Sequence, residues 1–135
     1  MKLSDIKPIP ALSIVLSTAG VTEMIYDGSK PTSQLPDNFI EIMQNGSFKT
    51  NSNSMSIIGG VLLLTINVKL LPNGTVNLKK EEIILKKFES LFENNKVKIS
   101  GLYHFRLDTN NLVYGGQEIS KGYSTKIINL LVKIY

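Results

Sequence analysis

The residue best suited to general acid–base catalysis near neutral pH is His104, the only histidine of the chain. It alternates with Tyr103 and Phe105 along a segment that has strand character. Catalysis would require a carboxylate or hydroxyl partner beside the imidazole, and a histidine-based metal triad would require further histidines. A lone histidine in a strand is more often structural than catalytic, so we expect His104 to be structural.

Carboxylates and glycines supply no other catalytic pattern. Four aspartates fall in turn or terminal positions, where a short carboxylate bonds to nearby backbone amides: Asp5, Asp27, Asp37 and Asp108. Neither Gly59-Gly60 nor Gly115-Gly116 is followed by the Gly-Lys-Ser/Thr sequence of a phosphate-binding loop, and both pairs are better explained as bends or bulges. The sequence therefore predicts no enzyme, no cofactor and no metal site.

Size and composition predict a single domain, residues 1–135, with a packed core. Hydrophobic residues make up 42% of the chain, and the absence of cysteine rules out both disulfides and thiolate metal sites. The N-terminal residues lack the pattern of a signal peptide. The longest apolar run, residues 61–71, is interrupted by polar residues and is too short to cross a bilayer as a helix, so we expect no membrane partner.

The basic residues are almost all lysine. The formal net charge is +4, and Arg106 is the only arginine among fifteen basic residues, which argues against bidentate, sequence-specific reading of DNA bases. A lysine excess still favours contact with a phosphate backbone or another acidic surface, although a solvated surface explains it as well. A stacking platform for single strands would need several aromatic rings on one exposed face, and the candidates are Tyr103, Phe105, Tyr114, Tyr123 and Tyr135.

Two helices are predicted. Between positions 12 and 19 apolar residues recur at helical spacing, Pro10 suits the first helical position, and Gly20 suits the end; alternation with serines also fits a strand, but the end signals favour a short helix. The main amphipathic helix is predicted at residues 78–93, with Asn77 as its N-cap. Its apolar stripe consists of Ile84, Leu85, Phe88, Leu91 and Phe92.

The remaining apolar segments predict strands at residues 24–26, 39–43 and 57–71, and the last of these reads as a central strand covered on both faces. Further on, residues 97–107 predict one strand kinked at Gly101. A strand that begins at residue 112 bends at Gly115-Gly116, and a last strand runs from residue 125 to 135. The fold class is therefore α+β: a mixed or antiparallel sheet packed by one main helix and a short N-terminal helix.

A polar excursion separates the strands at residues 39–43 and 57–71. Asn45-Gly46 predicts a turn, and residues 44–56 are rich in Asn, Ser, Thr and Lys with only two isolated large apolar side chains. This composition predicts a long polar loop or hairpin arm that becomes ordered on meeting a partner. The candidate subunit-contact residues of the arm are Asn45, Phe48, Lys49, Asn51, Asn53 and Met55.

The order of these elements resembles that of the tail-completion or tail-terminator proteins at bacteriophage head–tail junctions. The resemblance covers nearly the whole chain: a short helix, a strand leading to Tyr26-Asp27-Gly28, a proline-bearing loop, the strand at 39–43, the polar excursion, the strand at 60–71, the helix at 78–93 and the closing strands. It implies a structural virion protein, present in the host cytoplasm during assembly, that forms a ring of six or twelve copies.

Such a ring would cap or connect the tail beside neighbouring connector or tail proteins and let DNA pass without reading its sequence. The arm would then reach a neighbouring subunit or ring. The candidate channel lysines are Lys79, Lys80, Lys86, Lys87, Lys121 and Lys126. A small nucleic-acid-binding or protein-interaction module without catalysis is the alternative.

Overall fold

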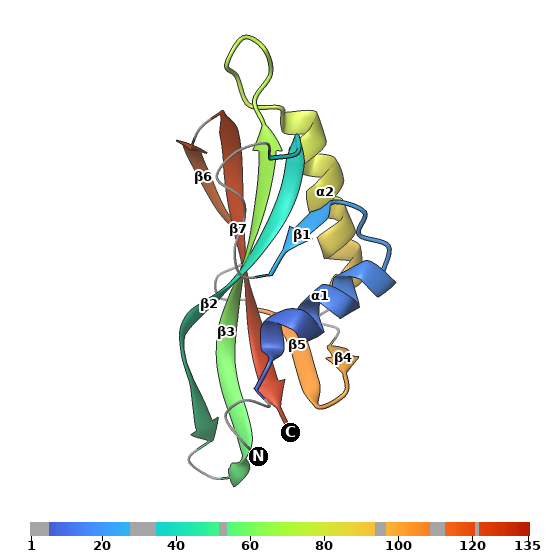
Figure 1. The fold of residues 1–135 in the computed structure, drawn as a ribbon, viewed down its shortest axis with the longest axis vertical. Coiled ribbons are helices and arrows are strands. Elements are labelled where there is room, and N and C mark those ends of the chain that lie inside the picture. Colours follow the sequence, from blue (N-terminus) through green and yellow to red (C-terminus); the bar gives the residue numbers. More distant parts are fainter. Residues whose placement is uncertain (1–5, 28–34, 52–53, 94–96, 109–112, 121) are drawn as a thin grey trace.

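The structure is a computed structural model that describes residues 6–27, 35–51, 54–93, 97–108, 113–120 and 122–135. Its elements, in chain order, are α1 (Pro8–Thr18), β1 (Met24–Tyr26), β2 (Asn38–Asn51), β3 (Ser54–Lys69), α2 (Leu78–Leu91), β4 (Lys98–Ser100), β5 (Tyr103–Leu107), β6 (Val113–Ser120) and β7 (Tyr123–Ile134). Figure 1 shows them as a ribbon. None of the helices described is long and apolar enough to span a membrane.

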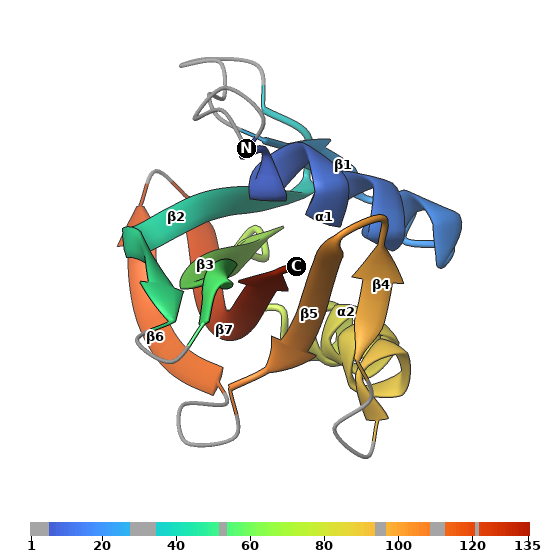
Figure 2. The same cartoon turned by 90° about the horizontal axis from the view of Figure 1, so that it is seen from below.

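The strands form one sheet in the order β1-β2-β3-β7-β5-β4, and β6 pairs with β7 off this path. β1 is parallel to β2, and the other pairings are antiparallel. β5 and β6 share one edge of β7, with β6 along its first half and β5 along its second half. The sheet is therefore mixed, which confirms the predicted α+β class, and Figure 2 shows that it is strongly curled.

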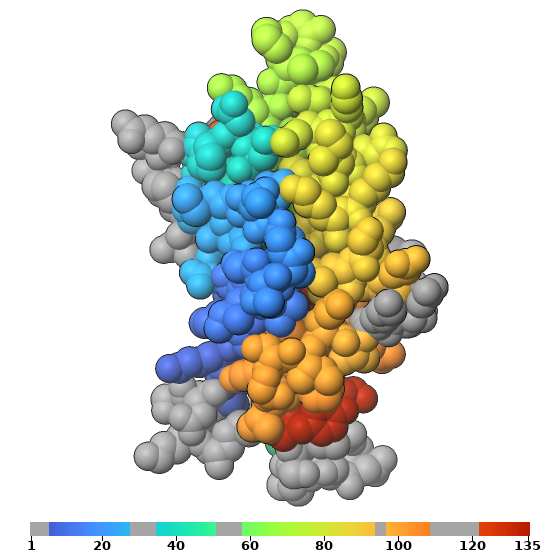
Figure 3. Space-filling model, turned by 90° about the vertical axis from the view of Figure 1, so that its right-hand side faces the viewer, coloured from blue at the N-terminus to red at the C-terminus, as the bar shows by residue number. Residues whose placement is uncertain are grey.

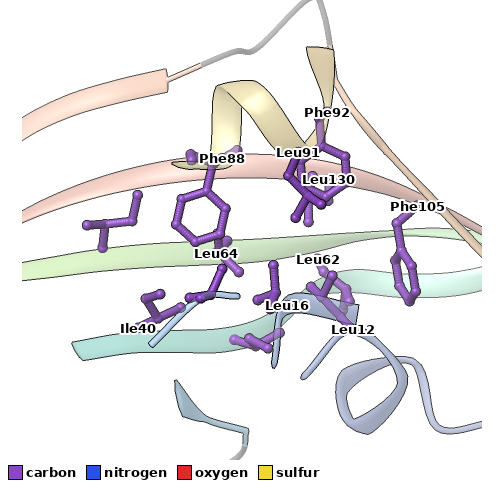
Figure 4. Packing of buried hydrophobic residues seen from close by; sticks show 14 of the residues in the cluster. Leu12, Leu16, Ile40, Leu62, Leu64, Phe88, Leu91, Phe92, Phe105 and Leu130 are labelled. Atoms are coloured by element: carbon purple, nitrogen blue, oxygen red, sulfur yellow. The ribbon is translucent and has the colours of Figure 1, made fainter. Parts of the chain in front are cut away.

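The hydrophobic core lies between the sheet and the two helices. On β3, alternate side chains are fully buried against the helices: Leu62, Leu64, Ile66 and Val68. They pack with the matching positions of β2 and β7 and with the apolar stripes of α1 and α2, as Figure 4 shows around Leu64 and Phe88. The predicted central position of this strand is confirmed, because β3 is flanked by β2 on one side and β7 on the other, whereas the helices cover only one of its faces.

The helix α2 forms where the sequence predicts it. The side chain of Asn77 accepts a hydrogen bond of 3.2 Å from the backbone N–H of Lys80, which satisfies one of the free donors of the first turn. The predicted apolar stripe faces the core, with Leu85 half-buried and the rest buried. The helix ends at Leu91, two residues before the predicted end.

The N-terminal element is a helix, as the end signals predict. It begins at Pro8, two residues earlier than expected, and its last residue is Thr18. Proline is accepted there because the first-turn N–H groups have no partner within a helix. Gly20 has a φ of 90°, and its N–H donates to the carbonyl of Ser17, so the chain reverses after the helix.

Two sequence predictions about turns are wrong. Residues 97–107 are not one kinked strand: β4 and β5 are separate antiparallel strands, and Gly101, with a φ of 58°, lies in the turn between them. The predicted turn at Asn45-Gly46 is also absent, because β2 continues to Asn51 and Gly46, with a φ of 77°, lies within the strand. Both glycines adopt a left-handed backbone conformation. The chain reverses only at Gly101, where β5 pairs with β4, whereas β2 continues past Gly46.

One partly buried ion pair ties α2 to the segment that precedes β1. Lys87 Nζ lies 2.8 Å from Glu23 Oε1, and the Glu23 side chain is 6% exposed. Burial by itself raises the pKa of Glu23, but the hydrogen bond from Lys87, a backbone hydrogen bond and the charge of Lys80 outweigh burial, so the pKa lies below its ordinary value. The carboxylate therefore stabilises the fold in its charged form.

We expect Lys87→Gln to lower the free energy of unfolding at pH 7 by about 1–3 kcal/mol, because it leaves the buried Glu23 carboxylate without its hydrogen-bonded cation. The matched control is Lys86→Gln, since Lys86 forms an exposed pair of 3.1 Å with Glu82 and its loss should cost less than about 0.5 kcal/mol. Urea unfolding of the three proteins measures both values. Equal losses in the two variants would contradict a stabilising role for the Lys87–Glu23 pair.

The Lys87–Glu23 pair also predicts that the free energy of unfolding falls at acid pH. Glu23 has a lower pKa in the folded chain than in the unfolded chain, so its contribution is complete above the unfolded value of about 4.3 and is lost as the pH falls through the folded pKa. In Glu23→Gln the free energy of unfolding should depend less steeply on pH between about pH 4.5 and the pKa of Glu23 in the folded chain. Urea unfolding at a series of pH values tests it, and an unchanged pH profile in Glu23→Gln would contradict the assignment.

Candidate interaction surface

The structure places His104 on β5 without an acid–base partner among the described residues. Its ring is half-buried, and its centroid lies 4.5 Å from that of Tyr135 at a tilt of 58°. Within the described part of the chain no group of three or more His, Cys, Asp or Glu residues could hold a metal ion. Three surfaces of the molecule are candidate functional features and are described next.

The first surface is the hairpin arm formed by the distal halves of β2 and β3. The pairing of β3 with β7 begins at Ile58, opposite Ile134, and the part of β3 before it is paired only with β2, through Ser54 opposite Asn51. Figure 1 shows this hairpin extending past the lower end of β7. The polar excursion predicted from the sequence is thus mainly a β-hairpin.

The predicted arm residues fall into three groups. Asn45 and Lys49 are exposed on β2, and Phe48 is half-buried. Asn51 ends β2 and Met55 lies near the start of β3. Asn53 lies outside the described residues. The structure therefore places five of the six candidates on one hairpin.

An insertion in β2 fixes the base of the arm. Asn45 pairs with Val61 and Lys49 pairs with Gly59, so three residues of β2 face the single residue Gly60 of β3. The ring of Phe48 lies directly over Gly60, in the space that a Cβ atom would occupy. The irregularity expected at Gly59-Gly60 therefore lies in β2, whereas β3 passes the glycine pair in regular register with β7.

The second surface is the sheet face opposite the helices, called here the helix-free face. At one end it is closed by three packed aromatic rings, with the Phe39 centroid 5.7 Å from Tyr26 and 5.3 Å from Tyr123. Beside them Thr125 donates to the Asn67 side chain at 2.7 Å, and Asn67 donates to Thr65 at 3.1 Å. The sequence did not reveal these contacts, and the bond from Thr125 to Asn67 supports the pairing of β3 with β7.

At the other end of the helix-free face, basic residues from different strands meet. Lys49 pairs with Gly59, Gly59 pairs with Lys133, and Lys133 pairs with His104. Directly paired residues project from the same face, so Lys49, Lys133 and His104 form a row across the sheet. Arg106 lies two residues beyond His104 on the same face. We call these four residues the basic row.

The predicted channel lysines lie elsewhere. Lys79 and Lys80 are in the first turn of α2, and Lys86 and Lys87 form the ion pairs with Glu82 and Glu23 already described. Lys126 lines a hollow of about 300 Å³ beside α2 together with Glu81, Glu82 and Glu89. Lys121 lies outside the described residues. Carboxylates thus accompany four of these lysines: Lys80, Lys86, Lys87 and Lys126.

The third surface is apolar and lies where α1 meets β4. Ile14 and Ile99 are each 61% exposed, and Leu102 in the β4–β5 turn is 57% exposed. Ile14 and Ile99 border a shallow pocket of about 310 Å³. Figure 3 shows this side of the molecule, with α1 in blue next to the orange β4–β5 hairpin. Large apolar side chains gathered at a surface mark a site of protein contact.

Comparison with known proteins adds information on the fold alone. No protein-family model and no curated protein sequence matches the chain. The chain is similar to a solved structure of a protein that carries only a serial designation, with a TM-score of 0.58 and 15% identity over 100% of this chain and 96% of that chain. The arrangement of helices and strands is therefore one that another chain adopts over nearly its whole length.

The packing of Phe48 on Gly60 predicts a sharp difference between two neighbouring glycines. Gly60→Ala should displace the Phe48 ring and cost about 1–3 kcal/mol. Gly59→Ala should change stability by less than about 0.5 kcal/mol, because an added Cβ would meet only the Val132 carbonyl at 3.7 Å. Urea unfolding measures both. In a Phe48→Ala background the cost of Gly60→Ala should largely disappear, and a cost that persists there would exclude Phe48 as the cause.

Proposed function

We propose that the protein is a structural virion protein of a phage head–tail junction, and that its copies form a ring that caps or connects the tail and lets DNA pass. The observation that carries this proposal is the β2–β3 arm. The resemblance in element order implies an arm that reaches a neighbouring subunit, and the arm here is a hairpin that extends two strands of the sheet beyond β7. The ring would assemble in the host cytoplasm and remain in the virion.

The arm is suited to hold a neighbour because it is anchored in the core. β3 is the central strand of the sheet, and Phe48 packs at the arm's base beside the hydrophobic core. A hairpin held in this way transmits the position of one subunit to the next. A polar loop without strand pairing would have to be ordered at the moment of contact, at a cost of about 1–2 kcal/mol per residue.

A ring also needs a receiving surface at a different place on the subunit. The apolar surface of Ile14, Ile99 and Leu102 meets this requirement, because it includes the edge strand β4, which β7 and β5 separate from β3 in the strand order. Contacts between two different patches are heterologous, and they produce a closed ring when the rotation between copies closes. We therefore propose that the arm of one copy docks beside α1 and β4 of the next.

A second candidate function is a nucleic-acid-binding module without assembly. The basic row favours it, because cations gathered on one face attract a phosphate backbone whether or not the protein forms rings. The two functions differ in particle mass. A subunit of 15.0 kDa gives about 90 kDa or 180 kDa for the two ring sizes, whereas the module would remain a monomer.

Shortening the arm should abolish assembly and leave the fold. Replacing residues 51–57 by Asn-Gly joins Thr50 to Ile58, which already face each other, by a two-residue hairpin turn and keeps the pairing of Ile58 with β7. Light scattering of the wild type at increasing concentration should show ring-sized particles, and the shortened variant should remain a monomer with an unchanged circular dichroism spectrum. Rings of normal mass formed by the shortened variant would contradict the arm assignment.

The receiving surface has its own test. The double substitution Ile14→Ser and Ile99→Ser should prevent assembly, because it removes the two most exposed isoleucines beside the pocket. The control is Ile83→Ser, since Ile83 is 45% exposed on α2, away from that pocket. Sedimentation velocity distinguishes monomers from rings in each sample. Loss of rings in the control as well would show that any exposed isoleucine matters and would contradict the specific surface.

A further inference from the structure

We propose that the basic row on the helix-free face binds the phosphate backbone of double-stranded DNA without reading its sequence. The inference deepens the proposed function, on which it rests for the passage of DNA through a ring, because it names the face that would meet the DNA. In this proposal the basic row, and not the lysines of α2, is the main surface that contacts DNA. The register of the sheet, the environment of each cation and the shape of the face support it.

The register places the basic residues in one row across four strands. Lys49, Lys133 and His104 lie on β2, β7 and β5, with the glycine Gly59 of β3 between the two lysines. Neighbouring strands are about 4.8 Å apart, so the row spans about 14 Å measured along the sheet. Gly59 has no side chain, so a ligand can approach the backbone closely between the lysines.

The cations of the row are exposed and available for an external anion. Lys49, Lys133 and Arg106 are all exposed. Within the part of the chain that the structure describes, the ion pairs involve other cations, namely Lys69, Lys86 and Lys87. Asp108 follows two residues after Arg106, just past the end of β5.

The shape of this face fits a polymer better than a small anion. The hollow at the row is only about 200 Å³, and it is lined by His104, Arg106, Lys133 and Tyr135 with two apolar neighbours. A small ligand pocket is usually larger and buries most of its ligand. A duplex presents one charge per about 1.7 Å of its axis, so it can contact cations spread over a surface and release counterions at each contact.

The aromatic residues favour a duplex over a single strand. Single-strand binding combines cations with exposed rings on which bases stack. Tyr103 and Phe105 stack on each other, and Tyr123 packs against Phe39 at the far end of the sheet, so these rings do not form a platform with the basic row. Among the rings whose side chains the structure describes, Tyr135 is the one that accompanies the row, in contact with His104. One ring supports contact but not a stacked series of bases.

The test is the salt dependence of binding by the full chain to a fluorescein-labelled DNA duplex of random sequence, followed by anisotropy. The patch variant combines Lys49→Gln, Arg106→Gln and Lys133→Gln. The matched control removes the same charge from other exposed lysines and combines Lys69→Gln, Lys79→Gln and Lys86→Gln. Circular dichroism and thermal unfolding verify that both variants fold, which is expected because all six side chains are exposed.

We expect the wild type to bind at low salt and the patch variant to bind on the order of tenfold or more weakly. The slope of log K against log salt should be shallower by about 0.9 per cation removed, so by close to three in the patch variant. The control should retain most of the wild-type slope. Equal losses in both variants, or no wild-type binding at low salt, would overturn the proposal.

Two competition arms identify the ligand. Inorganic phosphate at the same ionic strength as a chloride control should displace the duplex no better than chloride, and stronger displacement would mean a small-anion site instead. An unlabelled single strand that competes better than the duplex, and loses this advantage in Tyr135→Ala, would overturn the choice of duplex DNA.

Particle mass separates this inference from the proposed function. Rings that do not bind DNA would be consistent with the proposed junction role and would contradict DNA binding by the basic row. Monomers that bind DNA through the basic row would support the row and reject the ring. The arm and the basic row can thus fail independently, because one is tested by mass and the other by salt-dependent binding.

Discussion

The arrangement of the molecule depends on the two ladders of hydrogen bonds that flank β3. β3 pairs with β2 on one side and with β7 on the other, and these pairings join segments far apart in the sequence. A slip of one residue would turn Leu62 and Leu64 out of the core and Thr65 and Asn67 into it. The bond from Thr125 to Asn67 works against that slip, because it joins β7 to β3 and would be lost.

The geometry of the arm follows from the register of β3 with β2 and β7. β2 carries two extra residues opposite Gly60, and an even number keeps the alternation of its side chains. Phe48 therefore meets Gly60 on the helix side, and Lys49 emerges with Gly59 on the helix-free face. A single extra residue would have exchanged these positions, so that lysine would meet the core and phenylalanine the solvent. The insertion changes the course of β2 without disturbing which face is apolar.

Local patterns in the sequence predicted those elements whose signals are also local. The cap at Asn77 and the apolar stripe of α2 lie within one helix, and the central strand is marked by its own composition. Left-handed glycines were harder to interpret, since Gly46 lies in a bulged strand and Gly101 in a turn. The basic row was beyond prediction, because the pairing of Gly59 with Lys133 joins distant segments that no spacing along the chain reveals.

The two proposed roles share one short segment of β2 yet remain separable. Neighbouring side chains on a strand point to opposite faces, so Phe48 contributes to packing at the base of the arm while Lys49 contributes charge to the basic row. A change of charge at Lys49 leaves the helix side of the sheet untouched. A change of volume at Gly60 acts first on the Phe48 ring and reaches the cations only through the backbone. The proposed assembly and the proposed DNA contact can therefore be tested one at a time.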